Sequence, residues 1–150
     1  MNMVQRYGRF SSAVSGIAYC IQKIETEVMS KHGLPGACAQ YLAALSNNED
    51  GLTVSKLSEI CMKDKAAVSR AVAQLEAKGF VRRNSAGTNI YRAPIVLTDT
   101  GKEVSGYVAK RASAAVEIAG LSDYEREEFY SALNLIAANL ARVCEKGLPE

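Results

Sequence analysis

One arginine stands among short side chains in the segment from Met62 to Arg83, which reads MKDKAAVSRAVAQLEAKGFVRR. At about 100° per residue, one side of a helix over this segment is apolar: Val68, Ala71, Val72 and Leu75. The opposite side carries three residues with short side chains, Ala66, Ser69 and Ala73, and one arginine, Arg70. A guanidinium can bind guanine through two hydrogen bonds, a hydroxyl can bind a base edge, and methyl groups can contact thymine. This side is therefore suited to the major groove of duplex DNA, which long side chains would keep at a distance. The alternative is a solvent-facing helix whose alanines only raise helix propensity.

Positive charge is concentrated around the same segment. Residues 62–92 contain seven basic and two acidic residues, a net charge of +5, whereas the whole chain of 150 residues carries +2. A local basic zone on a nearly neutral protein is the pattern expected for a nucleic-acid surface. The further residues predicted to contact DNA, mainly its phosphates, are Thr53, Ser55, Lys65, Arg82, Arg83 and Arg92. The alternative for this zone is an ordinary solvated surface.

The periodicity of the sequence predicts the elements that position these residues. Helices are expected in the N-terminal segment, over 37–46, 54–62, 65–78 and 99–119, and from 123 onward, with strands at 80–83 and 90–97. Four residues are predicted to cap the N-terminal ends of helices: Thr53, Asp64, Thr98 and Ser122. Ser122 is expected to form a capping box with Glu125. Glycines are expected to end three of the helices: Gly33, Gly79 and Gly120. In the helix over 54–62, the apolar side is predicted to consist of Val54, Leu57, Ile60 and Cys61. In the strand over 90–97, the residues predicted to share one side are Tyr91, Ala93, Ile95 and Leu97.

Two helices joined by a short turn and followed by a β-hairpin form a winged helix-turn-helix arrangement, predicted here over residues 33–98. The predicted fold is thus mainly α with a small β-hairpin wing. In the wing, arginines are expected to follow the DNA backbone or to enter the minor groove.

Both ends of the chain carry heptad-like apolar stripes. The residues of these stripes that are predicted to form a dimer interface are Phe10, Val14, Ile17, Phe129, Leu133, Ile136 and Leu140. Residues 1–32 and 99–150 are therefore predicted to form a helical dimerisation region, because two long amphipathic ends have few partners within so short a chain. Packing of the two stripes within one chain is the alternative.

Composition argues against several other classes of protein. The four cysteines, Cys20, Cys38, Cys61 and Cys144, are widely spaced, and His32 is the one histidine, so no metal site is predicted. The cysteines are expected to be small buried side chains in a reducing compartment. The sequence contains no apolar run long enough for a bilayer and no signal-peptide pattern, which predicts a cytoplasmic protein without a membrane role. We find no nucleotide-binding or hydrolase motif, so neither a cofactor nor an enzymatic activity is expected.

The stretch LTVSKLSEICMKDKAAVSRAVAQLEAKGFVRR, with LTDTGKE after the predicted hairpin, resembles the MarR family of bacterial transcription regulators. The resemblance implies a homodimer that straddles a pseudo-palindromic operator and inserts the helix over 65–78 into the major groove. It also implies a repressor that responds to a small molecule. The candidate ligand-binding residues are Tyr19, His32, Cys38 and Tyr41. The alternatives are a peroxide-sensing regulator that uses Cys20, predicted to be partly buried, and a winged-helix module that binds another protein.

The predicted wing departs from the family pattern at its tip. Asn89 stands at the place of the usual aspartate, and Ile90 and Tyr91 hold the usual basic positions. Arg92 lies one residue later. Either Arg92 takes over the wing contact, or the recognition helix supplies most of the affinity for DNA.

Overall fold

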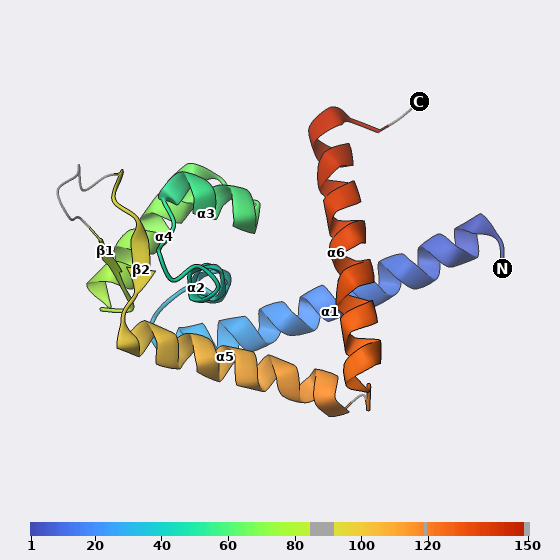
Figure 1. Cartoon of the computed structure of the whole chain (residues 1–150), viewed down its shortest axis with the longest axis horizontal. Helices are drawn as coiled ribbons and strands as arrows, with labels where there is room; N and C mark the ends of the chain where they lie inside the picture. Colours follow the sequence, from blue (N-terminus) through green and yellow to red (C-terminus); the bar gives the residue numbers. More distant parts are fainter. Residues whose placement is uncertain (85–91, 119, 149–150) are drawn as a thin grey trace. The chain divides into compact units, whose positions relative to one another are not determined.

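The computed structural model of the chain describes residues 1–84, 92–118 and 120–148. Its helices and strands follow one another as α1 (Met3–Ser30), α2 (Cys38–Ser46), α3 (Val54–Cys61), α4 (Lys65–Ala77), β1 (Val81–Arg83), β2 (Ile95–Leu97), α5 (Asp99–Ile118) and α6 (Asp123–Lys146), as Figure 1 shows. The chain divides into two compact units, residues 1–112 and residues 113–150. The predicted mainly helical fold with one antiparallel hairpin is confirmed.

The core of the first unit lies between α2, α3, α4 and the hairpin, and the last turns of α1 cover it. Leu42, Leu57, Val72 and Ile95 are fully buried there, and Val28 of α1 reaches the same cluster. In the hairpin, Val81 pairs with Leu97, and Leu52 forms a further bridge to Ile95. This core fixes α4 and the hairpin to one another, so their outer surfaces form one rigid unit.

The predicted helix starts are confirmed by side-chain caps. Thr53 accepts a hydrogen bond from the backbone N–H of Lys56 at 3.2 Å, and the Asp64 carboxylate accepts from two backbone N–H groups at the start of α4. Ser122 and Glu125 form the expected capping box at the start of α6. These caps are local in sequence, which explains why the sequence alone could locate them.

A close contact joins the end of α4 to the start of α5. The Thr98 hydroxyl donates to the carbonyl of Gly79 at 2.6 Å and accepts from the N–H of Gly101 at 3.1 Å. Gly79 has φ +76°, the left-handed conformation that glycine adopts most easily. A Cβ atom on Gly101 would collide with the carbonyl of Phe80. Glycine at 101 therefore lets α5 approach the hairpin closely.

Two predicted side-chain patterns hold only in part, since Leu57 of the first and Ala93, Ile95 and Leu97 of the second are buried as expected. On α3, Ile60 is 49% exposed, whereas Ser58 is buried with 7% of its surface exposed. The side of this short helix that faces the core is therefore rotated from the predicted stripe, away from Ile60 and toward Ser58. The second strand begins only at Ile95, since Pro94 has no N–H to donate to the ladder. Val96 is also buried, so the expected alternation of buried and exposed residues along this strand is absent.

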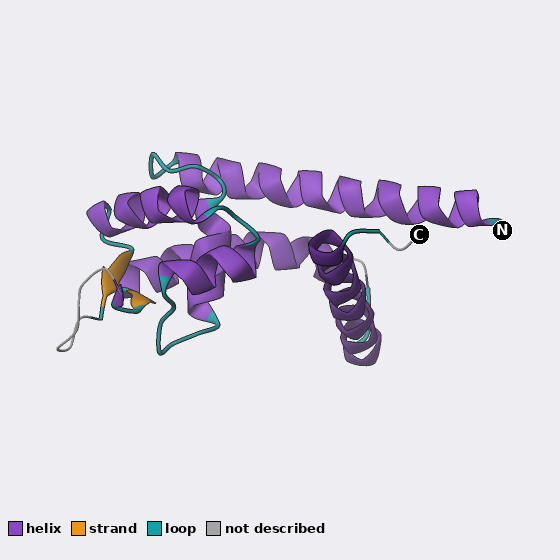
Figure 2. Cartoon of the chain, turned by 90° about the horizontal axis from the view of Figure 1, so that it is seen from above, coloured by secondary structure: helices purple, strands orange, loops and turns teal. Residues whose placement is uncertain are grey.

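The prediction that the cysteines are buried holds for Cys38, which is fully buried, but fails for two of the four. Cys20 and Cys144 are exposed, and Cys61 is intermediate. The buried residues of α1 are Glu25, Val28 and Met29, all of which follow Cys20 in the helix. Figure 2 shows the N-terminal part of α1 extending beyond the packed elements of its unit. The prediction that Cys20 is partly buried is therefore corrected.

The C-terminal part of α1 packs beside α5. Arg111 of α5 forms an ion pair with Glu27 of α1 at 3.2 Å, and it also donates to the Tyr107 hydroxyl at 3.3 Å. The Lys31 ammonium lies 5.9 Å from the centre of the Tyr107 ring. These polar contacts attach α5 to the helix that covers the winged core. Over the described residues, no helix is both long and apolar enough to span a bilayer.

Candidate nucleic-acid interface

Helix α4 presents its short-residue side to solvent. Val68, Val72 and Leu75 are fully buried, which turns the other side of the helix outward. The exposed residues on that side are Ala66, Ser69, Arg70, Ala73, Gln74 and Ala77, which we call the α4 strip. The protein's own side chains do not cover the strip in this chain, as entry into a DNA groove requires.

The start of α4 combines a cap with an exposed cation. The Asp64 carboxylate accepts from the N–H of Ala66 at 3.1 Å and of Ala67 at 3.0 Å. These two hydrogen bonds hold the pKa of Asp64 below its usual value, because they favour the charged carboxylate. The cap occupies two of the N–H groups that an anion could otherwise bind. The exposed Lys65 side chain is thus the better candidate for a phosphate contact at this end of α4.

The start of α3 offers two hydroxyl groups. Thr53 and Ser55 are both exposed. The oxygen of Thr53 is used as an acceptor by the cap, but its hydroxyl hydrogen remains able to donate. Both groups can therefore donate to phosphate oxygens near the first turn of α3.

The two neighbouring arginines of β1 have different environments. Arg82 is exposed, whereas the side chain of Arg83 is only 16% exposed and its Nε lies 3.7 Å from a carboxylate oxygen of Glu76. Glu76 is the acidic residue of α4, so this ion pair neutralises the one negative charge on the helix and attaches β1 to it. Arg92, which precedes β2 in the chain, is also exposed. The wing-tip positions Asn89, Ile90 and Tyr91 lie outside the described residues.

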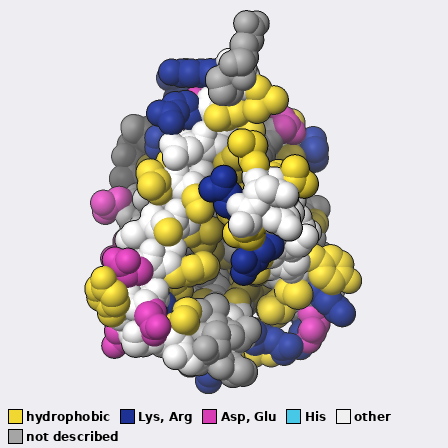
Figure 3. All heavy atoms as spheres, turned by 90° about the vertical axis from the view of Figure 1, so that its right-hand side faces the viewer, with side chains coloured by type: hydrophobic (Ala, Val, Ile, Leu, Met, Phe, Trp, Pro, Cys, Tyr) yellow, Lys and Arg dark blue, Asp and Glu magenta, His cyan; other side chains and the backbone are white. Residues whose placement is uncertain are grey.

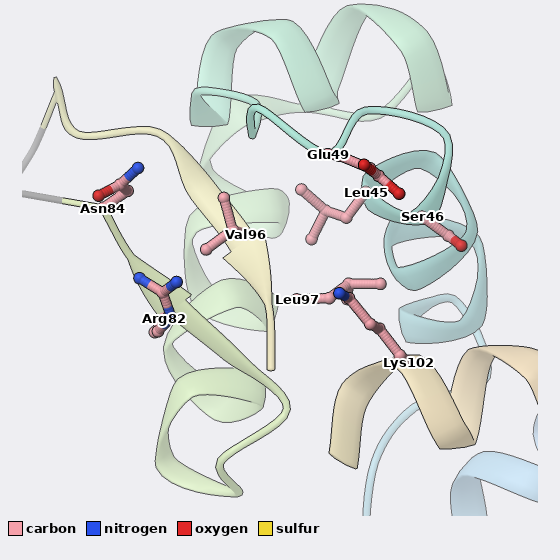
Figure 4. A pocket seen from close by; sticks show the side chains of 8 residues that line it. All are labelled: Leu45, Ser46, Glu49, Arg82, Asn84, Val96, Leu97 and Lys102. Carbon is pink, nitrogen blue, oxygen red and sulfur yellow. The ribbon is translucent and has the colours of Figure 1, made fainter. Parts of the chain in front are cut away.

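A hollow of about 420 Å³ lies at the base of the hairpin. Figure 4 shows the side chains that line it, which come from three parts of the chain: Leu45, Ser46, Glu49, Arg82, Asn84, Val96, Leu97 and Lys102. Two cations, Arg82 and Lys102, border an apolar floor formed by Leu45, Val96 and Leu97. Sequence reasoning did not single out Lys102 or Glu49, because no local pattern links them to the wing.

The four predicted ligand-binding residues do not share one environment. Cys38 and Tyr41 are buried in the winged core, and burial raises the pKa of the Cys38 thiol to about 11. The His32 ring packs edge-on against Phe80, with 5.1 Å between ring centroids. Tyr19 is 67% exposed on α1. The first three thus contribute to the core and its border, and Tyr19 faces solvent.

The apolar stripes at the two ends of the chain are exposed. On α1, Phe10, Val14 and Ile17 all reach solvent, and on α6 Phe129, Leu133 and Leu140 do so as well. Ile136 is intermediate, and α6 has no buried residue. Hydrophobic side chains are accordingly visible among charged ones in Figure 3. Exposed large apolar side chains at heptad spacing are typical of a surface that another helix covers.

The fold and the exposed α4 strip define a winged helix-turn-helix protein. The family model described as MarR family matches residues 32–89. The chain is 26% identical over 104 residues to the uncharacterized HTH-type transcriptional regulator YybA of Bacillus subtilis, a match that covers 68% of this chain and 69% of YybA. It is also 26% identical to a MarR-family regulator from Silicibacter pomeroyi, with a TM-score of 0.74 over 93% of this chain and 96% of that one.

The chain is thus similar to the MarR family in sequence over residues 32–89 and in fold over most of its length, and the proteins it matches are described as transcription regulators. The fold is also shared by a Staphylococcus aureus MarR solved in complex with salicylate and kanamycin. That match has 16% identity and a TM-score of 0.71, and it covers 92% of this chain and 94% of the other.

Proposed function

We propose that the chain acts as a homodimer that inserts α4 into the major groove of a pseudo-palindromic operator. The observation that carries the proposal is the exposed α4 strip, whose short side chains let the helix backbone approach the base edges. A guanidinium in a helix of this kind can bind the O6 and N7 atoms of guanine, which makes Arg70 the main base-reading residue. Ser69 binds a base edge or phosphate, and Ala66 and Ala73 contact thymine methyl groups.

The surrounding polar residues supply the contacts to the DNA backbone. Lys65, Thr53 and Ser55 lie at the starts of the two helices and are exposed. Arg82 and Arg92 extend the basic surface onto the wing. Arg83 is engaged with Glu76, and we assign it a supporting role in addition to any phosphate contact. Backbone contacts of this kind fix the position of the protein on DNA, whereas base contacts select the sequence.

A homodimer is supported by the apolar stripes that the chain leaves exposed. Phe10, Val14 and Ile17 of α1, with the stripe of Phe129, Leu133, Ile136 and Leu140 on α6, form the proposed interface. A twofold dimer presents two copies of α4, which matches the two halves of a pseudo-palindromic operator. The dimerisation region in this proposal comprises residues 1–32 and 99–150, and the DNA-binding domain residues 33–98.

We propose that a small molecule shifts the dimer between states of different DNA affinity, and that the unliganded state represses. A ligand can produce such a shift only by binding the two states with different affinity. The candidate positions remain Tyr19, His32, Cys38 and Tyr41. A protein of this fold that binds salicylate and kanamycin supports a small-molecule partner.

The experiment that tests the proposal is a salt titration of binding to duplex DNA, followed by selection of bound sequences from a random pool. We expect the affinity to fall steeply with salt, because phosphate contacts release counterions. Arg70→Ala should remove the preference for guanine at one position of each half-site. Arg142→Ala, which removes an exposed arginine of α6, is the matched control and should leave the selected sequence unchanged. Absence of affinity for any duplex at low salt would instead support a winged-helix module that binds another protein.

Exposure of the Cys20 thiol favours a second candidate, a regulator that senses peroxide through this residue. Mild peroxide should then oxidise Cys20, as seen by mass spectrometry, and release the DNA. Cys20→Ser should abolish the response, and Cys144→Ser, which removes the other exposed thiol, should retain it. Unchanged DNA binding after complete oxidation of Cys20 would exclude this mechanism.

A further inference from the structure

The α4 strip contains one long uncharged polar side chain, Gln74, which the sequence patterns did not assign to any contact. Gln74 is exposed and follows Arg70 by four residues, so it lies one turn further along the helix and about 40° around it. We propose that Gln74 is a second base-reading residue and that it selects an adenine in each half of the operator. This inference rests on the proposed insertion of α4 into DNA.

The side-chain amide of Gln74 has the chemistry that adenine requires. Its oxygen accepts from the N6 amino group of adenine while its NH₂ group donates to N7, which is the bidentate pairing that Gln and Asn make in the major groove. Over the described segments of the chain, the Gln74 amide has no hydrogen-bond partner, so its donors and acceptor are available. The neighbouring residues of the strip, Ala73 and Ala77, are too short to compete for the same base.

The surroundings of Gln74 also keep negative charge away from it. Two residues further along, Glu76 lies about 160° around the helix from Gln74, on the side that faces β1. There its carboxylate is paired with Arg83. Gln74 therefore borders Arg70 and the alanines of the strip, and the helix side it occupies carries no carboxylate.

Helix geometry predicts the spacing of the two base contacts. Four residues of α-helix rise about 6 Å, and successive base pairs are about 3.4 Å apart. If Arg70 binds a guanine, Gln74 reaches bases within about two base pairs of it. Each half-site should thus contain a guanine and an adenine at this separation, on the same or on opposite strands.

The inference is tested by selecting bound duplexes from a random pool with the whole 150-residue chain and four variants, one of which is the Arg70→Ala variant described above. Gln74→Ala should lose the adenine preference at one position per half-site, by about fivefold or more, and keep the guanine preference. Alanine is the best helix former, so this substitution preserves α4, which thermal unfolding will check. Gln74→Arg should change the preferred base at that position from adenine to guanine. Gln22→Ala, which removes an exposed glutamine of α1, should leave the selected sequence unchanged.

The possible outcomes separate the two proposals. An identical base preference for wild type and Gln74→Ala, with the guanine preference lost only in Arg70→Ala, would overturn the role of Gln74 and leave the regulator proposal intact. A uniform loss of affinity in Gln74→Ala without a change in base preference would also overturn it, because that is the behaviour of a phosphate contact. If the wild-type protein binds no duplex at low salt, both proposals fail together.

Discussion

The α4 strip and the N-terminal half of α1 are both helix surfaces that the chain leaves exposed, but their side chains are opposite in kind. The strip consists of alanines, a serine, an arginine and a glutamine. The exposed side of α1 carries Phe10, Val14 and Ile17, which are 39%, 40% and 53% exposed. Burying apolar surface is favourable by about 25 cal/mol per Å², so α1 gains from an apolar partner, whereas the strip is suited to a charged and hydrated one.

This difference shows that exposure alone does not identify a binding surface. The α4 strip and the exposed side of α1 differ in the size and polarity of their exposed side chains. Long apolar residues at heptad spacing fit a second helix. Short residues around a cation fit a polyanion whose groove admits one helix. The predictions below test this assignment, beginning with the largest expected effect.

The apolar stripe of α6 should be required for the dimer. Leu133→Asp places a charge in the proposed interface, and an unpaired buried charge costs about 3–5 kcal/mol, which should produce monomers at micromolar concentration. Sedimentation equilibrium measures the change. Leu135→Asp is the matched control, because Leu135 is 64% exposed and lies on the other side of α6. A Leu133→Asp protein that remains dimeric while Leu135→Asp dissociates would assign the interface to the opposite side of the helix.

The close approach of α5 to the hairpin should depend on Gly101. Gly101→Ala puts a methyl group against the Phe80 carbonyl, and such overpacking destabilises by about 1–3 kcal/mol. Gly106→Ala on the same helix meets nothing within 4 Å and should stabilise by about 0.5–1 kcal/mol, because alanine loses less backbone entropy. Denaturant unfolding compares the two variants. Equal stabilities would show that the contact at Gly101 relaxes without cost.

The two arginines of β1 should separate DNA binding from stability. Arg82→Ala should weaken binding to all duplexes and lower the salt dependence by about one phosphate contact, with unfolding unchanged. Arg83→Ala removes the ion pair with Glu76 and should lower the free energy of unfolding by about 1 kcal/mol or less. Fluorescence anisotropy and denaturant unfolding measure the two effects. If Arg83→Ala instead weakened DNA binding and Arg82→Ala lowered the free energy of unfolding, the phosphate contact would be assigned to Arg83.

The cap of α4 should give the protein a small dependence of stability on pH. The pKa of Asp64 is lowered from 3.8 by the N–H groups of Ala66 and Ala67. A carboxyl whose pKa is lower in the folded state stabilises the protein fully above the unfolded pKa, and this contribution is lost as pH falls below about 3.8 and through the folded pKa. Thermal unfolding at a series of pH values measures it. Asp64→Asn keeps a good cap and should remove this part of the pH dependence; an unchanged pH profile would contradict the assignment.

The sequence by itself determined the elements and the chemistry of the exposed helix. Thr53, Asp64 and Ser122 identified helix starts, because a cap joins residues two or three positions apart. The spacing of Val68, Val72 and Leu75 determined which side of α4 is buried and thereby which side carries Arg70. These features depend on local backbone geometry, which neighbouring residues specify.

The tertiary structure decided what depends on contacts between distant segments. Only the packed core showed that Arg83 pairs with Glu76 while Arg82 is exposed, and that Ser58 and not Ile60 faces inward. It also buried Cys38 and Tyr41 and left Cys20 in solvent. The physical reason is that burial and ion pairing arise where helices and strands meet, and the relative placement of such elements is set by the packing of the whole core and not by the periodicity of any one of them.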